Sequence, residues 1–275
     1  MEYSVLMSVY YREKPEQFRE SLLSILHQTI PTDNFVLVCD GPLTKELDAV
    51  IEEMRPAFGE SLQVVRLPEN KGLGRALNEG LRFCRHEMIA RMDSDDISRP
   101  DRCQKELNAF ASTGADIISG TVEEFSGSIG QVRVCRALPE KHEDILAFAR
   151  RRNPFNHPCV MYRKSAVEAA GGYQDFYLLE DYYLWVRMLL AGSRGYNLQE
   201  PLLWMRAGSD MYRRRSGISY ARSQRDLFRY MKNQNFIGTA DYYTSCLVRT
   251  ASSLAPNWLR ERLFRQFVRN KGEKS

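Results

Sequence analysis

The segment Met88–Arg102, MIARMDSDDISRPDR, restricts the possible folds more than any other part of the chain. The apolar run Met88–Met92 is followed at once by three carboxylates, Asp93, Asp95 and Asp96. Such a run is typical of a strand buried on both faces, and open α/β sheets bind ligands outside the carboxyl ends of their strands. Crowded carboxylates repel one another, and oxygen-only ligands favour Mg²⁺ or Mn²⁺, with phosphate oxygens often completing the coordination. The alternative is an Asp-rich surface turn before a helix.

Apolar runs of strand length alternate with helical patterns through the first hundred residues. The expected strands are Ser4–Val9, Phe35–Cys39, Leu62–Leu67 and Met88–Met92. The expected helices begin near Pro15, Leu43 and Leu73, and Pro100 suits the first turn of a fourth. This alternation predicts right-handed βαβ units, and therefore an α/β nucleotide-binding fold with a mostly parallel sheet flanked by helices.

The pattern changes after Ala115. Further strands are expected at Asp116–Phe125, Gln131–Ala137, Cys159–Tyr162, Tyr196–Gln199 and Leu202–Arg206. Further helices are expected at Glu140–Arg151, Tyr182–Ala191, Ser219–Asn235, Asp241–Leu254 and Pro256–Asn270. We expect a nucleotide-binding domain over residues 1–210 and a basic helical extension over residues 211–275.

Charge and composition limit the partners. From Met211 onward the chain has 14 Lys and Arg residues against 4 Asp and Glu, whereas the preceding part is mildly acidic. A basic tail of this kind predicts an anionic partner: a membrane surface, polyphosphate or nucleic acid.

The six cysteines show no C-x-x-C spacing, which predicts reduced cysteines and no zinc or disulfide framework. No signal-peptide pattern opens the chain and no apolar run approaches the roughly 20 residues that span a bilayer, so we expect neither a secreted nor an integral membrane protein.

Three features near the expected strand ends could bind a nucleotide. Asp40 follows the second strand, where it could bind a base or ribose or simply form an Asp-Gly turn. Tyr10 could stack on a base or cover the edge of the sheet. Gly72 and Gly74 precede a helix and permit close approach of phosphate, with Arg75 nearby. The glycines match neither G-x-G-x-x-G nor a Walker sequence.

Glu180 and Asp181 open an expected helix. The helix dipole stabilises acidic residues there by about 0.3–1 kcal/mol, but either could also act as a general base. Adjacent helical residues point about 100° apart, so at most one of them faces a substrate.

His157 is either a core histidine or a polar site residue. Arg206 and the run Arg213, Arg214 and Arg215 could bind a diphosphate or a lipid headgroup, although such runs are usually solvated.

The order of these motifs is more specific than any one of them. SVYYRE, CDGP, NKGLGRALNEG, MDSDDISRPDR and LLEDYYLWVR together resemble glycosyltransferase family 2, the inverting enzymes of the GT-A fold. The resemblance covers roughly Ser4–Arg206 and is closest to bacterial capsule and exopolysaccharide transferases. The sequence CDGP replaces the DDGS of many members, but Asp40, which matches the family's base-binding position, is retained.

The resemblance implies a nucleotide-sugar donor, with UDP as the expected nucleotide, and a divalent metal, Mn²⁺ or Mg²⁺. The residues expected to bind the donor are Ser8, Val9, Tyr10, Glu13, Asp40, Asn70, Gly72, Arg75, Asn78, Asp93 and Ser94. Asp93 and Asp95 are the expected metal ligands, and Asp95 the direct one. Asp181 is the expected catalytic base, with Glu180 beside it. His157, Arg206 and Arg214 are candidates for contacts with the acceptor or diphosphate.

The acceptor implied is a saccharide linked to polyprenyl diphosphate. In the segment PNWLRERLFRQFVRNK, residues 256–271, apolar and Arg residues are interleaved, as in helices that lie in a lipid headgroup region. The alternative is a helix that packs on the catalytic domain. We expect a cytoplasmic protein, peripheral on the inner face of the cell membrane. A non-catalytic sugar-nucleotide-binding module and a sugar nucleotidyltransferase are the competing interpretations, and no recognised motif supports nucleic-acid binding.

Overall fold

The computed structural model describes residues 1–125, 127, 129, 132–207 and 217–254. The chain divides into two compact units. The first comprises Met1–Asp175 with Glu180–Arg206, and the second comprises Phe176–Leu179 with the chain from Ala207 onward. The domain boundary predicted at residue 210 stays a prediction. Arg214 and the helix expected over residues 256–270 lie outside the described residues.

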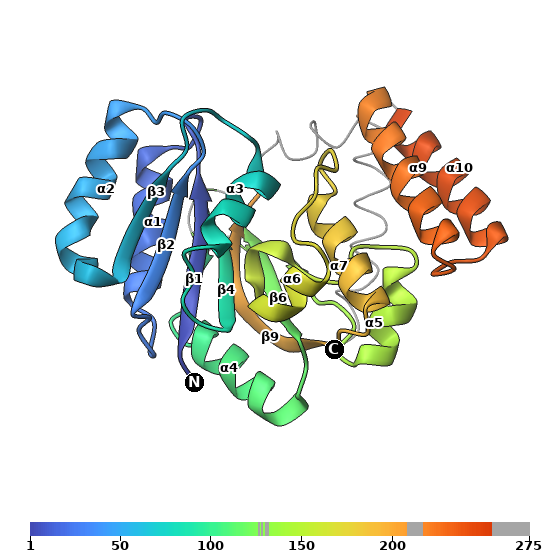
Figure 1. Ribbon diagram of the computed structural model, residues 1–275, viewed down its shortest axis with the longest axis horizontal. Coiled ribbons are helices and arrows are strands. Elements are labelled where there is room, and N and C mark those ends of the chain that lie inside the picture. The colour runs from blue at the N-terminus through green and yellow to red at the C-terminus, as the bar shows by residue number, and fades with distance from the viewer. Residues whose placement is uncertain (126, 128, 130–131, 208–216, 255–275) are drawn as a thin grey trace. The chain divides into compact units, whose positions relative to one another are not determined.

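A mixed sheet forms the centre of the first unit (Figure 1). Its described strands are β1 (Tyr3–Val9), β2 (Asn34–Cys39), β3 (Leu62–Arg66), β4 (Met88–Asp93), β5 (Ile97–Ser98), β6 (Ile117–Phe125), β7 (Val132–Arg136), β8 (Val160–Arg163) and β9 (Gly195–Arg206). They lie in the order β3-β2-β1-β4-β8-β6-β9-β5, with β7 paired to β6. The strands β1 to β4 are parallel, as predicted. In contrast, β8 runs antiparallel to both of its neighbours, β4 and β6.

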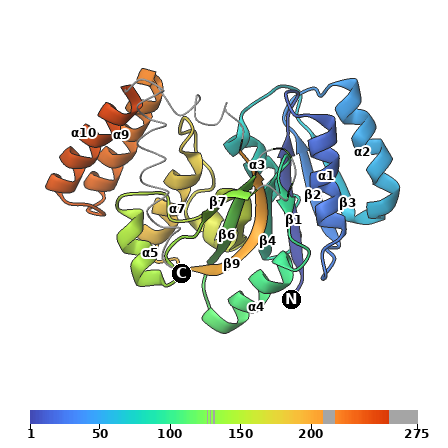
Figure 2. The same ribbon diagram turned by 180° about the vertical axis from the view of Figure 1, so that it is seen from behind.

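Helices cover both faces of this sheet. They are α1 (Pro15–Leu26), α2 (Lys45–Phe58), α3 (Leu73–Leu81), α4 (Arg102–Thr113), α5 (His142–Ala149), α6 (Lys164–Ala169) and α7 (Glu180–Leu190). Helices α3, α6 and α7 lie in front of the sheet in Figure 1, whereas α1 and α4 lie on the opposite face, which Figure 2 turns toward the viewer. Helix α1 forms because Pro15 suits its first turn and because Phe18, Leu22 and Ile25 share the buried face.

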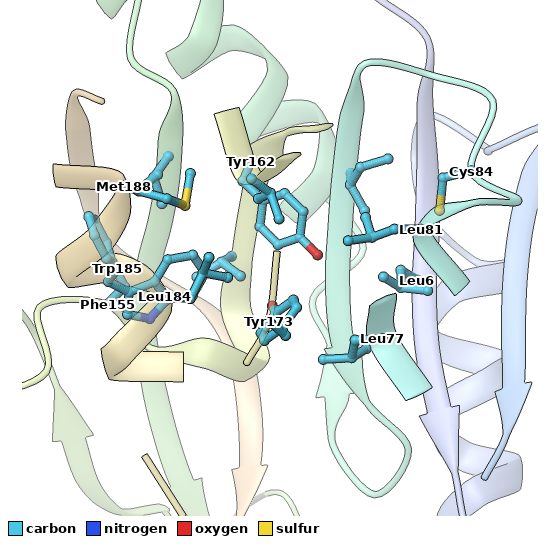
Figure 3. Close-up of a cluster of buried hydrophobic side chains, with 14 of the residues drawn as sticks. Leu6, Leu77, Leu81, Cys84, Phe155, Tyr162, Tyr173, Leu184, Trp185 and Met188 are labelled. Carbon is cyan, nitrogen blue, oxygen red and sulfur yellow. The ribbon is translucent and has the colours of Figure 1, made fainter. Parts of the chain in front are cut away.

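The core on the α3–α7 face sets the position of the site. In Figure 3, Leu184, Trp185 and Met188 of α7 lie on one side of Tyr162, and Leu77 and Leu81 of α3 lie on the other. Burying each large apolar side chain of this kind stabilises the fold by about 1.5–3 kcal/mol. The two helices therefore rest on one continuous apolar layer above the sheet.

Gly80 allows α3 to pack directly on the strands. A Cβ atom at this position would lie 2.4 Å from Leu6 Cδ1 and 2.6 Å from Val38 Cγ2. Both distances are far below van der Waals contact, so a larger residue would push α3 outward.

Two sequence predictions are wrong near β9. The strands expected at Tyr196–Gln199 and Leu202–Arg206 form one strand, β9, whose pairing with β6 shifts register near Gly120 and Thr121. Irregularities of this kind accommodate extra residues of β9 without ending the strand. The sequence placed Pro100 in the first turn of a helix, but α4 begins two residues later, at Arg102, because strand β5 pairs with β9 just before it. The sequence did not reveal β5, since a strand of two residues is too short to show a periodicity.

The second unit contains α9 (Gly217–Asn233) and α10 (Thr239–Leu254). They contact each other through Arg249, whose guanidinium lies 4.8 Å from the ring centroid of Phe228. The hydroxyl of Ser223 donates to the carbonyl of Tyr177, which ties the short Phe176–Leu179 segment to α9. Among the described helices, none combines the length and apolar character that crossing a bilayer requires.

All six cysteines are free, and Cys39, Cys84, Cys103 and Cys159 are buried. Burial raises the pKa of these four thiols; for Cys39 the pKa rises to about 11. They therefore act as small core residues and not as nucleophiles.

Candidate active site

The carboxyl ends of β1, β2 and β4 bring four of the predicted site residues to one edge of the sheet. Ser8 of β1 is paired in register with Asp93 of β4. On the other side of β1, the backbone N–H of Asp40 donates to the carbonyl of Val9 over 2.8 Å. Ser8, Val9, Asp40 and Asp93 therefore meet as the motif order predicted, because parallel strands end at a common edge.

Asp40 holds the loop that precedes α3. Its side chain is 3% exposed. One carboxylate oxygen accepts the backbone N–H of Lys71 over 2.7 Å, and the other accepts that of Gly72 over 3.0 Å. Asn70 donates from its side chain to the Asp40 carbonyl over 3.2 Å. A carboxylate offers about four acceptor positions, so Asp40 can bind a further donor while it holds the loop.

Gly41 is required for this arrangement. It adopts a positive φ of 86°, and a Cβ atom there would lie 2.6 Å from the backbone nitrogen of Asn70. Only glycine permits both the backbone conformation and the close approach of the loop.

The acidic segment after β4 is substantially buried. Asp96 is 2% exposed and accepts the backbone N–H of Arg206 over 2.8 Å. Burial, followed by the charges of Asp93 and Glu13, raises the pKa of Asp95 to about 7. Burial also raises the pKa of Asp96, with the charges of Asp95 and Asp93 acting in the same direction. A cation bound here would relieve this repulsion, which a surface turn would not create.

Glu13 and Arg206 complete the surroundings of this segment. Glu13 accepts the hydroxyl of Ser94 over 2.9 Å, so the loop after β1 contacts the acidic segment directly. The Nε atom of Arg206 donates to the carbonyl of Asp95 over 2.7 Å, and its guanidinium forms an ion pair with Glu20. The guanidinium also lies 4.8 Å from the ring centroid of Phe125. Arg206 thus stabilises the acidic segment from the end of β9.

The donor chemistry of this edge fits a divalent cation that is only partly coordinated by protein. Among the described residues, no group of three or more His, Cys, Asp or Glu side chains is placed to hold a metal ion. Asp93 and Asp95 offer oxygen ligands, and Mg²⁺ or Mn²⁺ commonly takes one or two carboxylates and completes its coordination with phosphate and water. The residues present therefore match a metal that binds together with a diphosphate.

The first turn of α7 faces the same edge. Glu180 packs on α3, where a Cβ atom on Gly74 would lie 3.7 Å from its Cβ. Burial, and then the charge of Asp181, raises the pKa of Glu180 to about 7, and the charge of Asp93 adds to this shift. Asp181 is oriented at both oxygens, since Asn153 donates to Oδ2 over 2.6 Å and the Tyr182 N–H donates to Oδ1 over 2.7 Å. The first turn of α7 is thus close enough to the acidic segment after β4 for their charges to interact.

Comparison with known proteins identifies the family. The sequence profile of glycosyl transferase family 2 matches residues 4–171. The chain belongs to this family. As a family 2 glycosyltransferase it is an enzyme, and the competing interpretations as a binding module or a nucleotidyltransferase have no support from this match.

Two bacterial relatives resemble this glycosyltransferase along nearly their whole length. The amylovoran biosynthesis glycosyltransferase AmsE of Erwinia amylovora is 41% identical over 92% of this chain and 94% of its own. A UDP-Gal:α-D-GlcNAc-diphosphoundecaprenol β-1,3-galactosyltransferase of Escherichia coli is 35% identical over 97% of this chain and 96% of its own.

Solved structures establish the fold of the glycosyltransferase as GT-A. S. aureus TarS 1–349, in complex with UDP-GlcNAc, matches 97% of this chain and 78% of its own with a TM-score of 0.67 at 18% identity. Full-length TarS matches with a TM-score of 0.66 at 18% identity, and this chain spans 46% of its length. A mannosyltransferase of Pyrobaculum calidifontis, in complex with GDP-Man and Mn²⁺, has a TM-score of 0.63 at 16% identity over 99% of this chain and 76% of its own.

Several predicted residues make protein contacts in the glycosyltransferase. Asn78 forms two hydrogen bonds with the backbone of Tyr173, donating over 2.6 Å and accepting over 2.8 Å. Arg75 forms an exposed ion pair with Asp175. His157 is 8% exposed and bonds the Tyr173 hydroxyl over 2.9 Å. Burial, and then the charge of Arg91, lowers the pKa of His157 well below its usual range, so its ring is neutral. Contacts of these residues with donor or acceptor stay predictions.

Two residues that the structure places at the site were not among those predicted. Asn153 lies in RRNPFNHP, where nothing distinguishes it from a turn residue, yet it orients Asp181. Arg91 interrupts the apolar run of β4 and is fully buried in an ion pair with Asp93. A charged residue inside a strand that is otherwise apolar was the available signal for Arg91.

Proposed function

We propose that this enzyme transfers a sugar from a UDP-sugar to a hydroxyl group of a lipid-linked saccharide, with inversion at the anomeric carbon. The observation that carries the proposal is that Glu180, in the first turn of α7, packs on Gly74 at the start of α3, directly after the loop that Asp40 holds at the end of β2. A diphosphate-binding edge and a carboxylate pair suited to proton abstraction thus share one site.

The donor binds at the carboxyl edge of β1, β2 and β4. Ser8, Tyr10 and Asp40 line the nucleotide side, and Glu13, Ser94 and the loop containing Asn70 and Gly72 border it. Support comes from the close approach of this loop to Asp40 and from the UDP-GlcNAc bound by TarS, a protein of the same fold. The choice of UDP also rests on the relative in E. coli that is named for a UDP-Gal donor.

Asp93 and Asp95 would hold a divalent cation between the protein and the diphosphate. When bound, the cation would stabilise the negative charge that develops on the leaving nucleotide diphosphate. The raised pKa of Asp95 and the neighbouring charges of Asp93 and Glu13 support this role, because all three favour a positive ligand. Asp95 is the direct ligand, as the family motif implies, and Asp93 offers its Oδ2 atom, because its Oδ1 atom accepts from Arg91.

Asp181 takes the proton from the attacking hydroxyl. Asn153 and the Tyr182 N–H hold its carboxylate in one orientation. Glu180, whose pKa is raised to about 7, packs against α3 and assists by shaping the site. A single displacement by the hydroxyl, from the face opposite the leaving diphosphate, inverts the anomeric carbon and needs no covalent sugar–enzyme intermediate.

The acceptor is a saccharide attached to a polyprenyl diphosphate. The E. coli relative is named for a diphosphoundecaprenol-linked acceptor, and AmsE is named for polysaccharide biosynthesis. The excess of Lys and Arg after Met211 suits an anionic lipid surface, so we place the enzyme in the cytoplasm, peripheral on the inner face of the membrane. Nucleic acid is not a partner in this proposal.

Isothermal titration of UDP, with and without Mn²⁺, tests the donor site. We expect wild type to bind UDP in a Mn²⁺-dependent manner and Asp95→Ala to lose that dependence. Donor screening with a synthetic lipid diphosphate–GlcNAc acceptor follows, and the anomeric configuration of the product is determined by NMR. Asp181→Ala should bind UDP as wild type does but form no product. A retained anomeric configuration, or turnover by Asp181→Ala at the wild-type rate, would contradict the mechanism.

A further inference from the structure

Arg91 is a buried cation directly beneath the acidic edge. In the sheet it stands beside Leu6 of β1 and Val160 of β8, and it is 0% exposed. Its side chain is on the same sheet face as Leu6, which belongs to the apolar cluster in Figure 3. Removing a guanidinium from water into such surroundings costs several kcal/mol, and an apolar residue would pack there without that penalty.

The hydrogen bonds of Arg91 are concentrated on one partner. Its Nη2 atom donates to Asp93 Oδ1, whereas Nε and Nη1 have no partner among the described residues. The backbone of Asp93 is held as well, since the hydroxyl of Ser21 in α1 donates to its carbonyl over 3.1 Å. The main chain and one carboxylate oxygen of Asp93 are thus both held in place, while Oδ2 is left for a ligand.

The ion pair is specific to these two residues. No other described arginine forms an ion pair with Asp93.

We propose that Arg91 is a positioning residue that orients Asp93 for the metal–nucleotide complex. The inference rests on the proposed donor site. Hydrogen-bond partners of metal-binding carboxylates typically affect metal affinity by about 10- to 100-fold. Arg91 is expected to act in this way without contacting the donor.

Arg102 offers a matched control. It is also 0% exposed, and its Nε atom donates to Oε1 of the equally buried Glu106 over 3.1 Å. Its Nη2 atom also donates to the backbone carbonyl of Arg91 over 2.7 Å, so the control removes this backbone contact but keeps the side-chain pair of Arg91 with Asp93. The double variant Arg102→Met/Glu106→Gln removes a buried ion pair of the same kind without leaving an unpaired charge. This double variant measures how far general destabilisation of the core weakens ligand binding.

The test is binding of Mn²⁺ in the presence of UDP, followed by electron paramagnetic resonance, with calorimetric titration of UDP as the second readout. We expect Arg91→Met to bind Mn²⁺ about 10- to 100-fold more weakly than wild type, and Arg91→Lys to lie between them, since lysine keeps the charge but not the planar geometry. The Arg102→Met/Glu106→Gln control should bind within about twofold of wild type, the change expected when outer-shell partners are untouched.

Each result has a separate meaning. Wild-type affinity in folded Arg91→Met overturns the inference, and so does an equal loss in the control. If Arg91→Met does not fold, Arg91→Lys decides, and wild-type affinity there overturns the inference. Failure of wild type itself to bind UDP with Mn²⁺ contradicts the proposed function instead.

Discussion

Asn153 and Asp181 are joined by a hydrogen bond of 2.6 Å from Nδ2 to Oδ2, although 28 residues separate them in the chain. The bond connects the segment after α5 to the first turn of α7. It orients the carboxylate that we propose as the catalytic base, so Asn153 is a positioning residue for Asp181.

We expect Asn153→Ala to lower kcat by about 10- to 100-fold, because a misplacement of about 1 Å at a catalytic group is enough for a loss of this size. The KM for the donor should stay unchanged, since Asn153 lies on the side of the proposed base. Steady-state kinetics with donor and acceptor varied separately will measure both parameters. Wild-type kcat in the folded variant would show that Asp181 needs no such partner.

The ionisation of Asp95 should make the free enzyme less stable as pH rises. Its pKa is 3.8 in an unperturbed side chain and about 7 in the folded protein. Between these values the native state binds more protons than the unfolded state, so the free energy of unfolding falls as pH rises through this window and then levels off.

Asp95→Asn has no ionisable group at this position, so its free energy of unfolding should not fall for this reason as pH rises. We expect it to exceed wild type in stability by about 1–3 kcal/mol near pH 7.5, with the difference vanishing near pH 4. Urea unfolding at several pH values, in the presence of a chelator, will measure this. A constant difference across the whole range would contradict a raised pKa at Asp95.

Asn78 distinguishes a structural role from a donor-binding role. Its two hydrogen bonds to Tyr173 connect α3 to the loop after α6. Asn78→Ala leaves backbone groups of Tyr173 without a partner, and we expect a loss of about 1–3 kcal/mol in the free energy of unfolding. Unfolding by urea and titration of UDP should be compared on the same preparation. A loss of UDP affinity without a loss of stability would favour the nucleotide contact that the family resemblance implies.

The packing of α3 on the sheet should not tolerate a methyl group at Gly80. We expect Gly80→Ala to lower the free energy of unfolding by about 1–3 kcal/mol, because the new Cβ overlaps side chains of β1 and β2. Glu79→Ala, at a partly exposed residue in the same helical turn, is the control and should change stability by less than about 1 kcal/mol. Thermal unfolding of both variants suffices. Equal melting temperatures would mean that α3 moves outward at little cost.

The nucleotide-binding half of the fold could be predicted because its signals are local. Apolar runs at Phe35–Cys39 and Met88–Met92 are buried strands, and helices between them require parallel pairing. The acidic segment at Asp93 follows from the same pattern, since it comes directly after a buried strand. The motif order from Ser8 to Asp181 then indicated the family. Each individual strand, helix or motif can be recognised within about 15 residues of sequence.

Contacts between distant segments could not be predicted in this way. The two-residue strand β5 exists because it pairs with β9, and β9 itself pairs along its length with β6. The orientation of Asp181 depends on Asn153, and that of Asp93 on Arg91, whose neighbours come from β1 and β8. Local sequence determined where the strands end and which carboxylates follow them. Only the tertiary structure decided which of these side chains are buried, held and charged, because burial and hydrogen bonding arise from residues far apart in the chain.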